Sequence, residues 1–350
     1  MTNLTARLSA LATAVPRYVL RQDEIMDRAD RLFPGLGAGD LAKLLSIYKN
    51  AGIETRYSCM PFDWYERPHG WAEKNRLFVR HAVDLLEDAA RQALDQAGMD
   101  IADIDVIVSV STTGIATPSL DALLMERMSA RRDVVRLPIF GLGCAGGVLG
   151  LARAATMACE ASGRTVLFLV AELCALTFRQ ADFSKSNLVA TALFGDGAAA
   201  AVITCDREGL AILASGEHTW SGSLDIMGWS VKDDGLGVVF SRDIPSLTRS
   251  AFSDAAVAFL SANGLTLSDI DQFICHPGGA KVLDALEDAF GLPRGRLDIS
   301  REVLRDYGNM SAVTVLFVLE RTLSAGRAGR FLLSSLGPGF TAGYLVLEAA

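Results

Sequence analysis

The sequence predicts an α/β fold built from two copies of one unit, and three observations support this fold class. Half of the 350 residues are hydrophobic, which is enough to fill a large core. Short apolar runs that suit buried strands alternate with longer segments of helical spacing. The pattern of residues 89–105 also recurs at residues 255–271, and such a repeat indicates a duplicated structural unit.

The first copy begins with a strand and a mostly helical region. Residues 4–16 alternate loosely between apolar and polar side chains and end at a proline, which predicts a first strand. Residues 23–48 are mostly helical, with one interruption rich in Pro and Gly. Residues 61–65 combine a proline with aromatic side chains and are predicted to form a loop.

A long helix and a buried strand follow. Residues 79–97 carry apolar side chains at helical spacing, and the glycine directly after them is a helix-terminating signal. Residues 104–110 then form an apolar run that predicts a buried strand.

The second copy lies 166 positions further on. A Gly-Arg pair before an apolar run at residues 163–164 recurs at residues 329–330 with this same offset. Two separate anchors at one offset make chance similarity a weak explanation. We therefore expect two halves, residues 1–207 and residues 208–350, joined near residues 205–220.

Composition excludes several classes of function. The formal net charge of −8 argues against nucleic acid and against an anionic membrane surface as the main partner. The chain contains no apolar run of about 18 residues, and its start lacks the regions of a signal peptide. The six cysteines include no Cys-x-x-Cys pair, so neither a zinc site nor a disulfide framework is predicted. We expect a soluble cytoplasmic protein.

One cysteine, Cys144, stands at the centre of the pattern. It lies among glycines, between an apolar run at residues 137–140 that suits a buried strand and a helical segment at residues 151–158. Glycines permit a sharp turn and close approach of a substrate. The start of a helix favours the thiolate form of a cysteine, which is the nucleophile. The alternative is a buried structural cysteine.

The repeat brings two further residues to this cysteine. Shifting Cys144 by 166 positions gives Met310, which follows Asn309. The predicted strand at residues 272–275 ends at His276. Because ligand sites in α/β sheets lie beyond strand ends and at helix N-termini, we expect the cysteine, the histidine and the asparagine to converge. Taken singly, the histidine and the asparagine are more often structural or turn residues.

A Cys, His and Asn set suits acyl transfer between thioesters. A thiolate accepts an acyl group, and an adjacent imidazole favours the thiolate and later offers an N–H donor. A neutral amide adds a second donor without a charge. Two donors aimed at a thioester carbonyl would stabilise the enolate that forms when a malonyl thioester loses carbon dioxide. In a cysteine protease, by contrast, the asparagine would orient the histidine and water would hydrolyse the acyl enzyme.

The sequence resembles the thiolase superfamily and, within it, the type III polyketide synthases, also called the chalcone and stilbene synthase family. The resemblance implies a thiolase-like five-layered αβαβα fold from two pseudo-duplicated halves. The N-terminal half would carry the nucleophilic cysteine, and the C-terminal half the histidine and the asparagine. The segments that carry the resemblance occur in family order and span most of the chain: residues 143–147, 172–178, 193–200, 276–279, 307–312 and 337–341.

The resemblance implies an acyltransferase that condenses malonyl-CoA iteratively onto an acyl-CoA starter. Cys144 would hold the starter and the growing polyketide as thioesters. His276 and Asn309 would promote decarboxylation of malonyl-CoA, and His276 would also help to keep the cysteine as a thiolate. Cyclisation to a pyrone, a resorcinol or a related ring would follow. The resemblance further implies a homodimer with no metal and no bound redox cofactor.

The resemblance also assigns substrate-binding residues. Phe194 matches one of two gatekeeper phenylalanines. The other gatekeeper position falls on Val238 rather than Phe240, so the second gatekeeper is not assigned. The other matching positions are Cys174, Thr177, Ser311, Gly337, Pro338 and Gly339. Basic candidates for the CoA site are Lys49, Arg56 and Lys281, with solvated surface charges as the alternative.

The product class is indicated only in outline. The sequence is similar to bacterial members that take long fatty acyl starters and make alkylpyrones or alkylresorcinols. Val238 in place of an aromatic residue would enlarge the cavity, which suits a long or bulky starter. The alternatives are a single-condensation enzyme like ketoacyl synthase III and a non-catalytic scaffold subunit. The starter, the number of extensions and the mode of cyclisation are left open.

Overall fold

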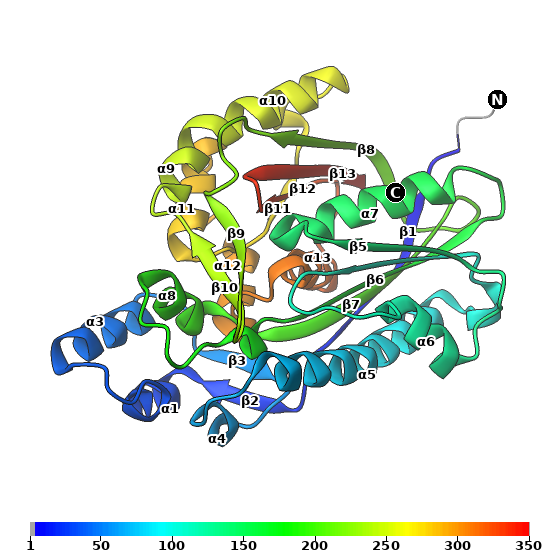
Figure 1. Cartoon of the computed structure of the whole chain (residues 1–350). Helices are drawn as coiled ribbons and strands as arrows, with labels where there is room; N and C mark the ends of the chain where they lie inside the picture. The colour runs from blue at the N-terminus through cyan, green and yellow to red at the C-terminus, as the bar shows by residue number, and fades with distance from the viewer. Residues whose placement is uncertain (1–3, 350) are drawn as a thin grey trace.

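A computed structural model describes residues 4–349 of the chain. Nine strands form one continuous mixed sheet in the order β11-β12-β13-β8-β1-β7-β6-β4-β5 (Figure 1). The first half contributes β1 (Arg7–Ala14), β4 (Val106–Ser111), β5 (Val135–Phe140), β6 (Thr165–Leu173) and β7 (Asp196–Thr204). The second half contributes β8 (Leu210–Thr219), β11 (Gln272–Cys275), β12 (Arg330–Gly337) and β13 (Thr341–Glu348). A short pairing between β1 and β8 joins the halves.

Helices cover both faces of each half and give the five layers. Two helices, α7 (Gly146–Ala158) and α13 (Thr314–Ser324), lie between the halves and pack against strands of both. The outer face of the first half is covered by α5 (Trp71–Ala97) and α6 (Leu120–Met128). The outer face of the second half is covered by α10 (Ser253–Ala262) and α11 (Ala280–Ala289), with α12 (Asp298–Tyr307) beside them. The predicted five-layered αβαβα fold is confirmed.

Burial on both faces explains the sequence of the central strands. In β7, Ala199, Ala201 and Ile203 point toward the two central helices. The intervening residues Ala198 and Ala200 point toward α5 on the other face. A strand covered on both sides reads as a continuous apolar run instead of an alternating one. The many alanines keep the side chains short.

The internal repeat is confirmed, but its offset drifts near the cysteine. Two 3-10 turns of the same design, Ile101–Asp103 and Leu267–Asp269, keep the offset of 166. The central helices α7 and α13 begin at Gly146 and Thr314, which are 168 positions apart. The 3-10 turn before each helix shifts with it, so the structural counterpart of Cys144 is Ala312 instead of Met310.

Two local expectations were wrong. Residues 61–65 contain a one-turn helix, α4 (Phe62–Tyr65), in place of a loop. The apolar run before the cysteine is β5, an edge strand whose Phe140 is 59% exposed, and it is not buried. The connection between the halves is the short turn after β7, residues 205–209, which lies within the expected range of 205–220.

Smaller elements surround the site. The N-terminal segment folds into β2 (Tyr18–Arg21), α1 (Gln22–Asp27), α2 (Ala29–Leu32), α3 (Ala38–Lys49) and β3 (Thr55–Ser58). Later in the chain come α8 (Lys185–Leu193), the hairpin of β9 (Met227–Lys232) and β10 (Gly235–Phe240), and α9 (Ile244–Leu247).

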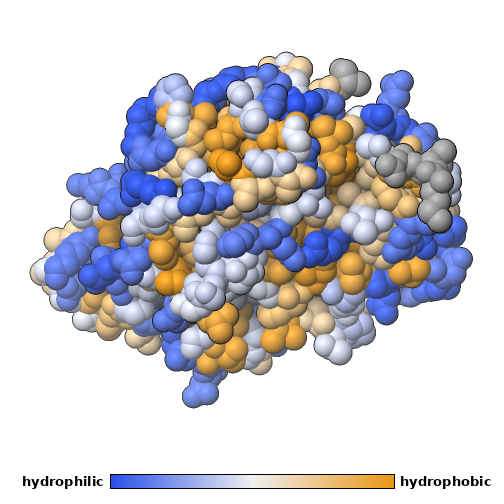
Figure 2. Space-filling view, turned by 90° about the horizontal axis from the view of Figure 1, so that it is seen from above, coloured by the Kyte–Doolittle hydropathy of each residue, from blue (hydrophilic) through white to orange (hydrophobic). Residues whose placement is uncertain are grey.

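The surface is mixed in character. On the face seen from above, hydrophobic residues form separate patches between hydrophilic ones (Figure 2). Among residues 4–349, no helix has both the length and the apolar character needed to cross a membrane.

Candidate active site

The nucleophile turn is held by close contacts at its glycines. Cys144 lies in the 3-10 turn Gly143–Ala145 between β5 and α7. Gly143 has a φ of +48°, and a Cβ atom there would lie 2.4 Å from Cδ of Pro338. A Cβ atom on Gly147 would lie 2.2 Å from the carbonyl oxygen of Ala312. Only glycine fits both positions, which explains the Gly-Cys-Ala-Gly-Gly sequence.

One cavity of about 700 Å³, called here the reaction cavity, brings the three predicted residues together. Cys144, His276 and Asn309 all line it. His276 directly follows β11, and its backbone N–H donates to the carbonyl of Ser334 at 2.9 Å. Both ring nitrogens of His276 are buried and have no hydrogen-bond partner within residues 4–349. A buried imidazole without a partner is placed to bind a substrate atom.

Asn309 is fixed by hydrogen bonds at both ends of its amide. Its Nδ2 donates to the carbonyl of Gly278 at 3.2 Å, and its Oδ1 accepts the backbone N–H of Ser311 at 2.8 Å. Its backbone pairs with the residues on either side of Phe194, because Asn309 N–H donates to the carbonyl of Leu193 at 2.7 Å and Gly195 N–H donates to the Asn309 carbonyl at 3.1 Å. One N–H of the amide remains available as a donor.

Burial keeps the thiol and the imidazole uncharged. Cys144 opens onto the cavity but is surrounded by protein, and this burial raises the pKa of its thiol to about 12. Burial lowers the pKa of His276 to about 3. The Sγ atom donates to Oγ of Ser311 at 3.8 Å, a weak contact that lowers the thiol pKa in part. In the substrate-free site, burial therefore favours the uncharged thiol and the uncharged imidazole.

A buried carboxylate, Glu172, was not singled out as a site residue from the sequence. It ends β6, and its Oε2 accepts the backbone N–H of Thr112 at 2.9 Å and the hydroxyl of Thr113 at 2.8 Å. Burial raises the pKa of Glu172 to about 7, and its negative charge raises the pKa of Cys144. The signal that could have found it is an acidic residue at the end of an apolar strand.

This coupling gives a pH-dependent prediction. Above pH 7 the charge of Glu172 opposes ionisation of Cys144, so removing that charge lowers the thiol pKa and increases the thiolate fraction. We expect Glu172→Gln to speed alkylation of Cys144 by iodoacetamide severalfold at pH 9. Below about pH 6, where Glu172 is protonated, the variant and the wild type should converge. Peptide mass spectrometry measures the rates, with alkylation of Cys205 as the internal control; equal Cys144 rates at pH 9 would contradict the coupling.

Comparisons with known proteins identify the family. Residues 2–207 match the N-terminal domain of the chalcone and stilbene synthases, and residues 217–349 match their C-terminal domain. The chain belongs to the chalcone and stilbene synthase family. It is a type III polyketide synthase of the bacterial kind, an acyltransferase.

Relatives and solved structures agree along nearly the whole chain. A 1,3,6,8-tetrahydroxynaphthalene synthase of Streptomyces peucetius is 39% identical over 97% of this chain and 92% of its own length. A putative chalcone synthase of Bacillus subtilis is 36% identical over 98% of both chains. The crystal structure of 1,3,6,8-tetrahydroxynaphthalene synthase from Streptomyces coelicolor superposes with a TM-score of 0.92, at 28% identity over 98% of this chain and all of that one.

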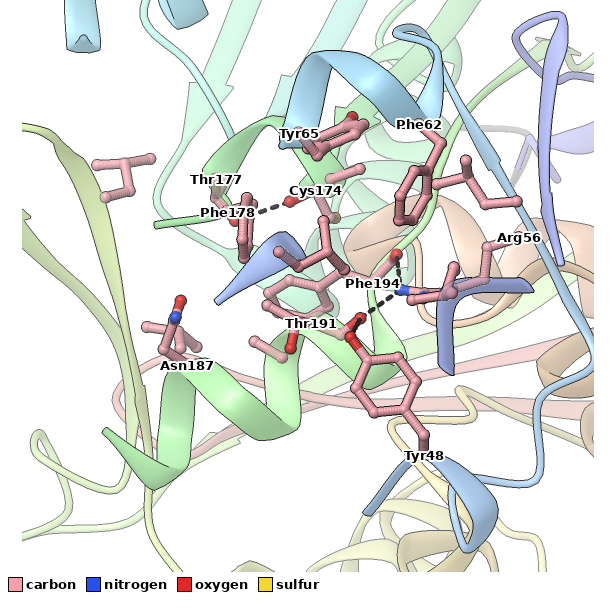
Figure 3. A pocket seen from close by; sticks show the side chains of 17 residues that line it. Tyr48, Arg56, Phe62, Tyr65, Cys174, Thr177, Phe178, Asn187, Thr191 and Phe194 are labelled. Carbon is pink, nitrogen blue, oxygen red and sulfur yellow. Dashed lines mark hydrogen bonds between the residues drawn. The ribbon is translucent and has the colours of Figure 1, made fainter. Parts of the chain in front are cut away.

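Four of the predicted substrate-binding residues of this polyketide synthase line a second, smaller cavity. Cys174, Thr177, Phe194 and Val238 surround about 50 Å³ of free space beside α8 (Figure 3). Its walls are mostly apolar, and the hydroxyl of Thr177 donates to the carbonyl of Cys174 at 2.7 Å. The structure thus places these four residues together, in a cavity beside the reaction cavity.

Arg56 also lines the second cavity, and this corrects its assignment to the CoA site. The side chain is only 4% exposed. Its Nη1 donates to the carbonyls of Thr191 at 2.6 Å and Phe194 at 2.9 Å (Figure 3). Burial lowers the pKa of the guanidinium. The guanidinium is buried, with Nη1 bound to two backbone carbonyls and Nη2 donating to Oε1 of Gln22 at 3.1 Å. Arg56 therefore supports the chain around Phe194 and is not placed to meet a CoA phosphate.

Aromatic rings refill the space that Val238 leaves. The ring of Phe194 meets Phe240 edge-on at 5.9 Å and Trp229 at 6.1 Å. Phe240 lines the reaction cavity, whereas Val238 lines the second one. The expected enlargement at Val238 is therefore offset by Trp229, and Phe240 is the residue that shares the boundary with Phe194.

Three further predicted substrate-binding residues, Gly337, Pro338 and Gly339, make structural contacts. Gly337 packs on the nucleophile turn, where a Cβ atom would lie 2.4 Å from the carbonyl oxygen of Leu142, and Pro338 packs on Gly143. Gly339 donates its N–H to Met227 at 3.3 Å. Gly337 and Pro338 thus hold the nucleophile turn, and Gly339 binds the start of β9. None of the three lines the reaction cavity, where the resemblance placed them.

The mouth of the reaction cavity carries positive charge. Lys281 lines it, as predicted, together with Lys185 and Arg242, which were not predicted. All three side chains are exposed, and none of them forms an ion pair within residues 4–349. Lys49 is exposed on α3 but lies outside the lining.

Proposed function

We propose that this polyketide synthase condenses malonyl-CoA iteratively onto an acyl-CoA starter held as a thioester on Cys144. The observation that carries the proposal is the convergence of Cys144, His276 and Asn309 in one cavity, with both nitrogens of the buried imidazole free of protein partners within residues 4–349. CoA thioesters would be the only small molecules required. The boundary between the halves at residue 207 and a cytoplasmic location remain predictions.

Loading of the starter begins with proton transfer. The neutral imidazole of His276 accepts the proton of Cys144 as Sγ attacks the thioester carbon, because neither group is charged beforehand. A new C–S bond forms, the bond from that carbon to the CoA sulfur breaks, and the proton leaves on the CoA thiol. His276 is then neutral again and can donate one N–H.

Decarboxylation and condensation use the two donors. The N–H groups of His276 and Asn309 bind the thioester oxygen of malonyl-CoA, where negative charge develops as the C–C bond to the carboxylate breaks. Carbon dioxide leaves, and the enolate carbon attacks the acyl carbonyl on Cys144. The new C–C bond forms as the bond to Cys144 breaks, which frees the Cys144 thiolate and leaves the extended chain as a thioester of CoA. Attack of this thiolate on that thioester returns the chain to Cys144 and releases CoA, which takes up a proton.

A long or bulky starter followed by closure of a pyrone, a resorcinol or a related ring fits the apolar walls of the reaction cavity. The second cavity is too small for such a chain, so the acyl group would lie on the Cys144 side. Apolar side chains from several helices form that wall: Ile47, Val189, Leu193, Ile244, Val282 and Leu286.

A homodimer through the β5 edge fits the exposed apolar side chains there. The edge strand β5 has no partner strand on its outer side within residues 4–349. Its Phe140 is 59% exposed and its Val135 44% exposed, and Ile115, which follows the neighbouring strand β4, is 51% exposed. Natural proteins rarely leave an edge of this kind uncovered. Light scattering of Phe140→Asp should show a shift toward monomer relative to the wild type.

Incubation with isotope-labelled malonyl-CoA tests the function. Acetyl-, hexanoyl- and lauroyl-CoA would be offered as starters, and the products read by mass spectrometry. We expect at least two extensions and ring closure on the preferred starter. Products with one extension only would favour the single-condensation alternative, and no labelled product at all would contradict the proposal.

Charge at the mouth gives a second prediction. Lys185, Arg242 and Lys281 have no competing carboxylate and would attract the phosphates of CoA. We expect each change to Ala to raise KM for malonyl-CoA about threefold at low salt, with little change in kcat and a smaller effect at high salt. Lys49→Ala is the matched control, since Lys49 is exposed nearby on α3 but outside the lining. An equal rise in KM in Lys49→Ala would mean that the overall electrostatic field of the surface, and not direct contact at the mouth, attracts CoA.

A further inference from the structure

The β9–β10 hairpin is a separate part of the fold. Its two strands pair only with each other and not with the nine-stranded sheet. The hairpin lies beside α8 in Figure 1, and its strand β10 packs against that helix. Because no sheet fixes it, its position over the cavities depends on side-chain contacts.

The hairpin forms a wall shared by both cavities. Trp229, Val238 and Phe240 cluster with Phe194 and Cys174. Phe240 reaches the reaction cavity and Val238 reaches the second cavity. A shift of the hairpin would therefore move the boundary between the two cavities and change the room for a growing chain.

An ion pair anchors the tip of the hairpin. The Asp234 carboxylate accepts Nε of Arg179 at 2.8 Å and 2.9 Å and lies 2.8 Å from Nη2. Arg179 also pairs with Asp182 at 2.6 Å, and the amide of Asn187 at the start of α8 donates to the carbonyl of Arg179 at 2.9 Å. Such a fork geometry fixes orientation as well as distance. The tip is thus tied to the segment that joins Thr177 to α8.

A buried lysine completes the anchor from the first half. Lys74 on α5 is 5% exposed, and its Nζ donates to the carbonyls of Phe178 at 2.7 Å and Asp234 at 3.3 Å. Gly235 beside the tip has a φ of +139°, and a Cβ atom there would lie 3.9 Å from this Nζ. Burial lowers the pKa of Lys74 to about 8, which marks the cost of placing a charge there. The mechanism above does not use this charge.

We propose that Lys74, Arg179 and Asp234 form a latch that fixes the β9–β10 hairpin and thereby sets how many extensions the cavity accepts. The inference rests on the proposed function. None of the three residues lines the reaction cavity, so they act as positioning residues. They specify the product by holding Phe240 and Val238 in place.

Product distributions of matched variants test the latch. Asp234→Asn keeps the size of the side chain but removes the ion pair, whereas Asp233→Asn removes the same charge from the neighbouring exposed residue, which has no ion-pair partner within residues 4–349. We expect Asp234→Asn to change the ratio of the two main chain lengths about tenfold. Asp233→Asn should match the wild type, and Arg179→Lys should lie between the two. The wild-type rate of Cys144 acylation should persist in all three.

The outcomes separate the latch from the proposed function. A wild-type enzyme that extends normally, with an unchanged distribution in Asp234→Asn, would contradict the latch alone. An equal change in Asp233→Asn would contradict it too, because general charge would then explain the effect. If Asp234→Asn lowers the melting temperature, the test relies on Arg179→Lys, which keeps the positive charge but loses the two-nitrogen contact with Asp234. A wild-type product distribution in Arg179→Lys would then overturn the latch. No polyketide from the wild type would contradict the proposed function and, with it, this inference.

Discussion

Cys144→Ala is expected to abolish polyketide formation, with a loss of at least about a thousandfold in kcat/KM. The variant has no sulfur to carry the acyl group. Alanine fits the 3-10 turn without strain, because the glycines around it are unchanged. Intact-protein mass spectrometry after incubation with acyl-CoA should show the acyl adduct on the wild type and none on the variant.

The same variant separates loading from decarboxylation. His276 and Asn309 remain in place in Cys144→Ala, so slow release of carbon dioxide from malonyl-CoA should persist without chain growth. Cys174→Ala is the control, since this buried thiol lies in the second cavity. It should still load the starter on Cys144. Chain growth by Cys144→Ala at the wild-type rate would remove the cysteine from the mechanism.

Loss of either donor is expected to reduce decarboxylation about a hundredfold or more. Asn309→Asp keeps the acceptor for the Ser311 N–H but loses the donor and adds a charge that repels the enolate. His276→Ala removes the second donor and also the base for loading. Release of labelled carbon dioxide from malonyl-CoA measures the step directly.

A conservative change should show partial recovery at the histidine. Glutamine in His276→Gln retains an N–H donor but cannot accept the thiol proton at neutral pH, so decarboxylation should recover more than starter loading does. Equal recovery of both steps would contradict the double role of the histidine. Normal carbon dioxide release from both His276→Ala and Asn309→Asp would remove their assigned roles.

Much of the fold and the central residues could be predicted from the sequence. The repeat exposed the duplicated unit, because equal units bury equal faces and keep the same spacing of glycines and apolar residues. The glycines around Cys144 lie where the chain makes close contacts, such as the one between Gly147 and Ala312. The strand end at His276 and the turn at Asn309 followed from the same geometry of parallel strands.

What failed depended on long-range packing. Arg56 reads as a surface charge, but its burial follows from carbonyls of Thr191 and Phe194 that lie more than a hundred positions away. Protonation of the cysteine and the histidine depends on how deeply the cavity excludes water, which no local pattern reports. The replacement of volume at Val238 by Trp229 needs the register of the hairpin, which places these two residues opposite each other.

The backbone bonds between Asn309 and the residues on either side of Phe194 constrain how this enzyme can change. They involve main-chain atoms only, so the side chain at Phe194 can be exchanged without disturbing the Asn309 amide, which lines the reaction cavity. An inserted or deleted residue between Leu193 and Gly195 would break the pairing and displace that amide. Substitution of Phe194 is therefore compatible with the present position of Asn309, whereas a change in the length of the chain between Leu193 and Gly195 is not.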